Sequence, residues 1–276
     1  MTTLDATLPA HGRVGAAARS FLAIVERDLL VIRREAPSFL VQTLVQPLFF
    51  LFVFGKVLTG IGTATPSFGT ILLPGIVAFT CFLTPLQAVS IDLGRDLGFT
   101  HEIDDRLLAP LPNVLVALEK FGLAALRGLI AGACVFPLAY LVLGSGYHVR
   151  TDLVGEVAGM MVLTALLGAA IGMLVGAAVP ITQIGLIFSL LITPLLFTGC
   201  TYYPWSTLGG IGWFQVVTLF NPLTYAAEGL RHAMLPPIAG HPIETLPMGW
   251  VLVVLCGSLV VILGAGLRLF RHRVVS

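Results

Sequence analysis

The sequence predicts an all-α integral membrane protein with six transmembrane helices, an N-terminal amphipathic interfacial helix and further short helices in its loops. Two observations carry this prediction. Hydrophobic residues make up 57% of the chain and charged residues 11%, and the mean hydropathy is +0.98. Charged residues alone approach a quarter of a typical soluble domain. The apolar residues also gather into runs long enough to cross a bilayer.

Six segments have the length of about 20 apolar residues that a membrane-spanning helix needs. They are residues 39–60, 70–91, 118–143, 155–179, 183–203 and 245–267. The stretch from Val157 to Ala227 contains no Asp, Glu, Lys or Arg and would be about 100 Å long as one helix. It must therefore fold back. We expect one reversal at "AVPITQIG" (178–185) and another at "GCTYYPWSTLGGIG" (199–212), where Gly, Pro and interfacial aromatic residues favour turns.

The distribution of Lys and Arg predicts the orientation, because cytoplasmic loops of membrane proteins carry an excess of both. With both termini cytoplasmic, only Lys56, Arg150 and Arg231 of the 15 Lys and Arg residues lie outside. An odd number of spans would place one of the two basic ends outside. We therefore expect residues 1–37 to form a cytoplasmic tail and the interfacial helix, 38–270 the transmembrane domain, and 271–276 a cytoplasmic tail.

The segment before the first span has the pattern of a helix that lies flat in the inner headgroup layer. Residues 15–36 repeat apolar side chains at helical spacing, with basic side chains largely on other faces. Pro37 should end this helix. The alternative is a basic flank that only fixes topology. The residues that carry the prediction are Phe21, Val25, Arg27, Leu29, Arg33 and Arg34.

The loop after the second span, "DLGFTHEIDDRLLAPLPN" (96–113), concentrates charge in a chain with little of it. Over residues 98–109 a short helix can place Phe99, Ile103, Leu107 and Leu108 on one face and the charged residues elsewhere. Such a helix can seat apolar residues in a partner's groove while its charges set the register. An ordinary solvated loop is the alternative.

The segment 204–240 is too apolar for a free loop and too interrupted by Gly and Pro for a crossing. We expect short helices that dip into the outer leaflet, with Glu228 and Arg231 paired at i,i+3. A surface helix pair without function is the alternative.

In the fourth span, glycines recur every four residues and predict a close helix contact, more readily within the chain than between two copies. They are Gly168, Gly172 and Gly176.

Several functional classes lack support in the sequence. No HExxH, GxSxG or His/Cys/carboxylate cluster indicates an enzyme site, and a net charge of +1 gives no case for nucleic acid binding. The four cysteines are scattered singly, so neither a metal site nor a disulfide is expected. The spans hold no midmembrane carboxylate relay, since Asp92 and Arg127 fall near cytoplasmic ends where they can snorkel or pair. There is also no GxxxxGK[ST] loop, so any nucleotide energy must come from another chain.

Three stretches resemble the membrane subunits of type-2 ABC exporters, the family of daunorubicin-type drug efflux permeases and of polysaccharide exporters. They are "LVQPLFFLFVFGKVL" (44–58), "RDLGFTHEIDDRLLAPLPNVLVALEK" (95–120) and "FTGCTYYPWSTLG" with "LFNPLTYAAEGLR" (197–231). The matches run from about residue 20 to 270. One departure is that the middle stretch is more acidic than the usual pattern.

The resemblance implies a transport subunit and not an enzyme, without a cofactor of its own. It implies a dimer with a second copy or a related permease, bound to a cytoplasmic ATPase that holds ATP and Mg, in the bacterial inner membrane among its lipids. The short helix after the second span would be the cytoplasmic coupling helix, carried by Arg95, Phe99, Glu102, Ile103, Asp104, Asp105, Arg106, Leu107 and Leu108.

The outer re-entrant helices between the fifth and sixth spans would form a gate over the pathway. The gate residues are Tyr202, Tyr203, Trp205, Asn221, Pro222, Tyr225, Glu228 and Arg231. An uncharged interior rich in Phe and Leu favours amphipathic drugs or lipids as cargo. A lipid-linked glycan is the alternative, because aromatic residues cluster near the outer face, and an ATP-independent secondary carrier is the alternative of another class.

Overall fold

The computed structural model describes residues 10–65, 68–96, 113–144, 150, 152–236 and 244–275, without the side chains of 10–24, 113, 114, 274 and 275. The described part is helical and contains no β-strand. The long helices are α1 (Ala10–Phe50), α3 (Phe68–Arg95), α5 (Asn113–Leu143), α6 (Val154–Ala178), α7 (Ile181–Thr198) and α10 (Met248–Val275). The short elements are the π-helix η1 (Leu51–Val57), α2 (Leu58–Gly60), the 3₁₀-helix η4 (Trp205–Gly210), α8 (Gly212–Thr218) and α9 (Pro222–Met234).

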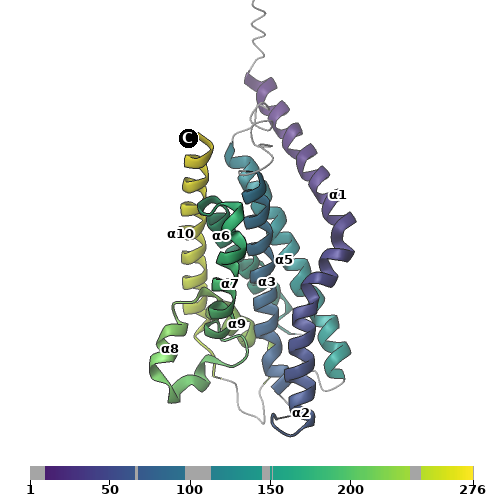
Figure 1. Ribbon diagram of the computed structural model, residues 1–276, viewed down its shortest axis with the longest axis vertical. Coiled ribbons are helices and arrows are strands. Elements are labelled where there is room, and N and C mark those ends of the chain that lie inside the picture. Colours follow the sequence, from purple (N-terminus) through teal and green to yellow (C-terminus); the bar gives the residue numbers. More distant parts are fainter. Residues whose placement is uncertain are drawn as a thin grey trace, which may run out of the picture.

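The prediction of six membrane spans is confirmed. Six helices are long and apolar enough to cross a bilayer: Val25–Gly60, Phe68–Arg95, Leu115–Leu143, Val154–Ala178, Ile181–Thr198 and Met248–Arg273. Successive spans run in opposite directions, so α1 begins and α10 ends at the same end of the molecule (Figure 1). We call this the termini end; the opposite end, which carries α2 and α8, is called the loop end.

The central helix is α3, which packs against α6, α5 and α9. Within its most apolar window 89% of the residues are buried, against 17% for α1, α7 and α10. Apolar side chains of the last three therefore face outward. Because lipid solvates such side chains as well as a protein core does, their exposure fits a membrane environment.

The prediction that Pro37 ends the N-terminal helix is wrong. Helix α1 continues through Pro37 and Pro47 as far as Phe50. A proline removes one backbone hydrogen bond, but an open break in apolar surroundings would leave several backbone groups without partners. The helix therefore continues, and the interfacial location of its first half stays a prediction. In Figure 1 this half leans away from the other helices.

Both reversals of the long uncharged stretch are confirmed. Helix α6 ends at Ala178, Pro180 has an extended backbone, and α7 begins at Ile181. Helix α7 ends at Thr198, earlier than the predicted residue 203, because Cys200 adopts a positive φ of 49° that turns the chain.

The glycines of the fourth span lie against α3. A Cβ atom added at Gly168 would overlap the carbonyl oxygen of Phe82, and one at Gly176 would lie 3.0 Å from Cα of Ser90. The hydroxyl of Ser90 lies 2.8 Å from the carbonyl oxygen of Gly172. Helices α3 and α6 thus meet with their backbones in contact, which only small residues permit.

We expect Gly168→Ala to destabilise the protein by about 1–3 kcal/mol, because the added methyl group has no space against α3. The measurement is the melting temperature of the purified protein in detergent. The matched control is Gly159→Ala in the same helix, where nothing lies within 4 Å of the added atom. Equal melting temperatures for the two variants would contradict the proposed packing constraint.

Candidate functional site

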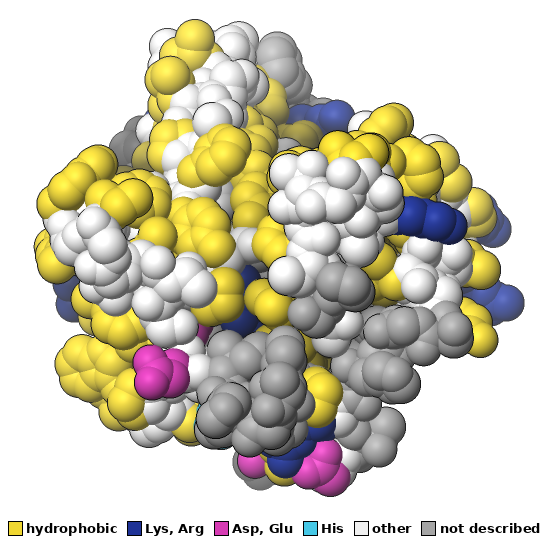
Figure 2. All heavy atoms as spheres, turned by 90° about the horizontal axis from the view of Figure 1, so that it is seen from below, with side chains coloured by type: hydrophobic (Ala, Val, Ile, Leu, Met, Phe, Trp, Pro, Cys, Tyr) yellow, Lys and Arg dark blue, Asp and Glu magenta, His cyan; other side chains and the backbone are white. Residues whose placement is uncertain are grey.

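Residues 199–234 build a compact cap at the loop end, which Figure 2 views directly. Hydrophobic side chains are spread across this face. Several belong to the segment around α8, where the exposed apolar residues are Ile211, Trp213, Val216, Val217 and Phe220. Helix α9, in contrast, is almost entirely buried. The cap therefore has a buried helix that fixes it and an apolar outer helix that faces away from the protein.

Asn221 joins the start of α9 to the end of α7. Its side-chain oxygen accepts a hydrogen bond from the backbone N–H of Leu223 at 2.9 Å and so caps the helix, with Pro222 at the first turn. Its side-chain nitrogen donates to the carbonyl oxygen of Leu195 and to the hydroxyl of Thr198, both at 2.9 Å. One side chain thus satisfies both a helix start and a helix end.

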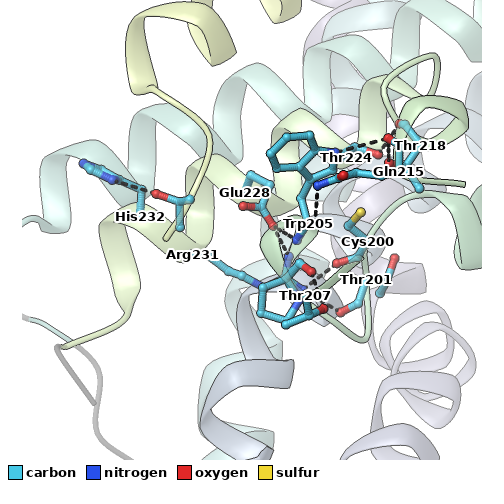
Figure 3. Close-up of polar contacts among 12 residues, drawn as sticks. Cys200, Thr201, Trp205, Thr207, Gln215, Thr218, Thr224, Glu228, Arg231 and His232 are labelled. Atoms are coloured by element: carbon cyan, nitrogen blue, oxygen red, sulfur yellow. Dashed lines mark hydrogen bonds and ion pairs between the residues drawn. The ribbon is translucent and has the colours of Figure 1, made fainter. Parts of the chain in front are cut away.

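Glu228 and Arg231 form an ion pair inside the cap, as the sequence predicted. Both side chains are 0% exposed, and the joining N–O distance is 2.7 Å. The same carboxylate oxygen accepts a hydrogen bond from the backbone N–H of Trp205 at 3.0 Å. Figure 3 shows these groups pointing toward one another from α9 and from the turn before η4. The pair therefore holds the turn against α9.

The guanidinium of Arg231 also holds the end of α7. It donates to the carbonyl oxygens of Cys200 and Thr201, the latter at 3.1 Å. These carbonyls belong to the tight turn after α7, whose backbone lies so close to α3 that a Cβ atom at Gly75 would overlap the Thr201 oxygen. Burial raises the pKa of the Cys200 thiol to about 11, so this cysteine stays protonated at neutral pH and serves packing.

Tyr202 connects the cap to the π-helical segment of the first span. Its ring lies 5.0 Å from that of Phe50 in an edge-on arrangement and 5.3 Å from that of Phe54 in a stacked one. Phe54 lies in η1, and a third ring, Phe197 of α7, lies 6.1 Å away. Such aromatic pairs add about 0.5–1.5 kcal/mol each beyond the buried area. The cap is therefore coupled to the first and fifth spans together.

The other residues of the predicted gate have structural contacts in the same cap. The hydroxyl of Tyr203 donates to the carbonyl oxygen of Phe197, and that of Tyr225 donates to Leu219 at 3.1 Å. The indole N–H of Trp205 donates to the carbonyl oxygen of Gln215 at 3.2 Å. All the predicted gate residues thus gather in one place, although they come from three segments.

At the termini end, two ion pairs join α3 to α5. Lys120 pairs with Asp96, and Arg127 lies 3.6 Å from Asp92. The pairing of Asp92 with Arg127 agrees with the expectation from their position near a span end. These contacts hold the end of α3 against the first half of α5.

Most of the predicted coupling helix, residues 98–109, lies outside the described residues. Only Arg95 of that set is described, as an exposed side chain at the end of α3. Of the predicted interfacial set, Arg27, Leu29, Arg33 and Arg34 are exposed and Val25 is half-buried, while the side chain of Phe21 is not described. Leu29, Leu30 and Val31 leave an apolar surface on this part of α1.

The structure also reveals a polar groove that the sequence reasoning missed. We call it the α1–α3 groove; it has a volume of about 320 Å³ and is lined by Gln42, Thr43 and Gln46 of α1 and by Thr80, Thr84 and Gln87 of α3. Asp92, Arg95 and Arg127 close its termini end. The i,i+4 spacing of Gln42 and Gln46 within a predicted span was the available signal, because such residues share one helix face.

Comparison with known proteins decides the family. The sequence pattern of the ABC-2 type transporter family matches residues 19–235, which include five of the six spans and the whole cap. The chain belongs to the ABC-2 type transporter family. It is therefore a membrane transport permease, and the predicted type-2 ABC resemblance is confirmed at the level of the family.

Individual relatives agree with this assignment. The chain is 23% identical over 220 residues to "Putative transport permease ycf38" of Pyropia yezoensis, a match that covers 76% of this ABC-2 protein and 72% of the relative. The proteins of the same name from Cyanophora paradoxa and Porphyra purpurea are 25% and 26% identical, with the same coverage. The closer resemblance to drug efflux permeases stays a prediction.

We expect Glu228→Gln to destabilise the permease by about 3 kcal/mol, because it leaves the buried Arg231 without a counter-charge. Glu228→Gln together with Arg231→Met should recover only part of this loss, since both charges are then gone but the carbonyl oxygens of Cys200 and Thr201 lose their donor. The measurement is the melting temperature in detergent.

The matched control for this prediction is Asp152→Asn. It removes the acid of an exposed ion pair with Arg150, which has an N–O distance of 2.6 Å, and exposed pairs contribute little to stability. A melting temperature as low for Asp152→Asn as for Glu228→Gln would show that burial of the pair is not the cause.

Proposed function

We propose that this permease is the membrane subunit of an ATP-driven exporter. In this proposal two copies form a pathway for amphipathic drugs or lipids, and a separate cytoplasmic ATPase supplies the energy from ATP and Mg. The observation that carries the proposal is the membership in the ABC-2 type transporter family over residues 19–235, in a chain whose sequence contains no phosphate-binding GxxxxGK[ST] loop.

The termini end is the proposed docking side for the ATPase. Both basic flanks lie at this end, and the excess of Lys and Arg supports a cytoplasmic location for it. Residues 97–112 connect α3 to α5 at the same end, where Asp96 pairs with Lys120 and Asp92 with Arg127. Because these pairs tie α3 to α5, a force on the loop would move two spans together.

The cap at the loop end is the proposed outer gate. Its inner helix α9 is fixed to α7 through Asn221 and Arg231, and Tyr202 contacts the first span. Its outer helix α8 presents Trp213, which is 72% exposed, and the turn after α8 presents Phe220, which is 84% exposed. Exposed aromatic residues at this position support contact with the outer leaflet. Movement of the first and fifth spans would therefore be transmitted to the cap, in the way rigid packed elements carry allosteric change.

Reconstitution tests the proposed function. We expect proteoliposomes with the permease and its ATPase to transport a fluorescent amphipathic drug or phospholipid only when ATP and Mg are present. The permease without the ATPase, and the complex with a non-hydrolysable ATP analogue, are the controls. Transport by the permease alone would support the secondary carrier and overturn the proposal.

Charge reversal tests the docking loop. We expect Asp104→Lys with Asp105→Lys to lower capture of the ATPase by the purified permease about tenfold or more, because complementary charges set the register of such contacts. The control is Glu244→Lys, which reverses an exposed charge beyond the cap. Unchanged capture by the double variant, with normal membrane insertion, would count against docking at this loop.

A further inference from the structure

Uncharged polar side chains from two membrane spans converge on the α1–α3 groove. Gln42 and Gln46 lie one turn apart on α1, and Thr80 and Thr84 one turn apart on α3. Gln87 follows on the same face of α3. The groove runs from the middle of these spans toward the termini end. A hydrocarbon environment disfavours such groups unless they bind a partner or water.

The glutamine amides of the groove have unused capacity for hydrogen bonds among the described residues. The hydroxyl of Thr80 donates to the carbonyl oxygen of Ile76 at 2.8 Å in its own helix. In contrast, the side-chain amides of Gln42, Gln46 and Gln87 make no hydrogen bond in the part of the chain that the structure describes. Each amide has two donors and one acceptor oxygen. The groove therefore presents both donors and acceptors to whatever fills it.

The charged residues nearby are already paired. Asp92 faces Arg127, and beyond this pair lies a second cavity of about 430 Å³ that is lined in part by Arg27, Asp28 and Lys120. Arg27 pairs with Asp28 at 2.9 Å, Lys120 pairs with Asp96, and Arg95 has a contact of its own. Each of these charged side chains thus already has an interaction within the protein. The groups that still lack hydrogen-bond partners are neutral side chains.

The groove is open to the surroundings on the side of α1. The side chain of Gln42 is exposed, and those of Gln46 and Gln87 are half-buried. In Figure 1 the first half of α1 is drawn apart from α3 and α5. Apolar side chains such as Phe39, Phe79 and Leu83 alternate with the polar ones along the groove, so both parts of an amphiphile find matching contacts there.

We propose that the α1–α3 groove binds the uncharged, hydroxyl- or amide-rich headgroup of a membrane amphiphile, such as a sugar-bearing lipid. The identification of this ligand as cargo rests on the proposed export function, whereas the binding itself does not. The groove thereby narrows the substrate class, since a plain hydrocarbon would leave the amides unsatisfied and an ionised headgroup would have to compete with ion pairs that are already formed.

Photolabelling tests the proposal. The purified permease is placed in phosphatidylcholine nanodiscs without ATPase, and is labelled with diazirine-bearing monoglucosyl diacylglycerol. Two comparison probes carry the same diazirine-bearing acyl chains: diacylglycerol, which lacks the sugar, and phosphatidylglycerol, which has an ionised headgroup. We expect the glucosyl probe to label residues 39–47 and 79–91 several-fold more than either of the others, and labelling of the exposed face of α10 to be equal for all three.

Removal of the amides should abolish the preference. We expect Gln46→Leu with Gln87→Leu to lower glucosyl labelling in the groove about fivefold or more, as the loss of two hydrogen bonds of about 0.5–1.5 kcal/mol each implies. The matched control is Gln183→Leu, which removes an exposed amide from α7 outside the groove. Labelling of α10 and the melting temperature report whether the variants are folded.

The outcomes separate the possible ligands and the two proposals. If octyl glucoside but not free glucose lowers labelling of the groove, the ligand is a membrane amphiphile. If free glucose lowers labelling as well, the proposal of a membrane amphiphile is overturned. Equal labelling by all three probes, unchanged labelling of the double glutamine variant, or crosslinks from the groove to a second copy would also overturn the inference. If the groove is labelled but no ATP-driven transport is measured, the proposed export function is overturned and the proposed binding in the groove is retained.

Discussion

A polar group in a bilayer must find its partner inside the protein, because lipid offers none. This constraint explains why α1 continues through two prolines instead of breaking at Pro37. It also explains the cap, in which Glu228 and Arg231 satisfy each other and three backbone groups of an irregular turn. An arginine at 0% exposure persists because the carbonyls that it binds would otherwise lack donors.

The same need for polar partners applies to the side chains that line the α1–α3 groove. In the cap, Glu228, Arg231 and the backbone of the adjoining turns meet at hydrogen-bonding distance, although one Glu228 oxygen, Arg231 Nε and the hydroxyls of Thr201 and Tyr202 have no partner in the described part. In the groove, three glutamine amides face a cavity without such partners in the described part of the chain. The two regions differ in access, because the polar groups of the cap are buried, whereas Gln42 is exposed and Gln46 and Gln87 are half-buried. The cap is a structural solution, whereas the groove has the chemistry of a binding site.

The bundle connects these two regions through α3. Gly75 of α3 meets the turn that Arg231 holds, and further along α3 the residues Phe82 and Ser90 meet the glycines of α6. Its last turns carry Asp92, which pairs with α5. One closely packed helix therefore contacts the cap, the groove and the root of the loop 97–112. Close backbone contacts of this kind leave little room for continuous deformation, so displacements favour rigid movements of whole helices.

Much of the fold followed from local sequence properties. Six apolar runs predicted six spans, Pro180 predicted a reversal, and the i,i+3 spacing predicted the Glu228–Arg231 pair. Pro37 led to the wrong prediction that the N-terminal helix ends there. The tendency of proline to end a helix is weaker than the need to keep backbone hydrogen bonds in an apolar environment. The groove was missed because each of its glutamines, taken alone, is an isolated polar residue, and only the packing of α1 on α3 brings the three together.

The sequence by itself determined the spans, their alternation and the charge bias between the two ends, since these depend on residue types and on distances along one chain. Only the tertiary structure decided which residues far apart in sequence meet. Tyr202 meets Phe50, Arg231 meets the turn after α7, and the amides of α1 face the hydroxyls of α3. Such meetings depend on how helices rotate and approach, which is set by side-chain packing and by the glycines that admit a neighbouring backbone.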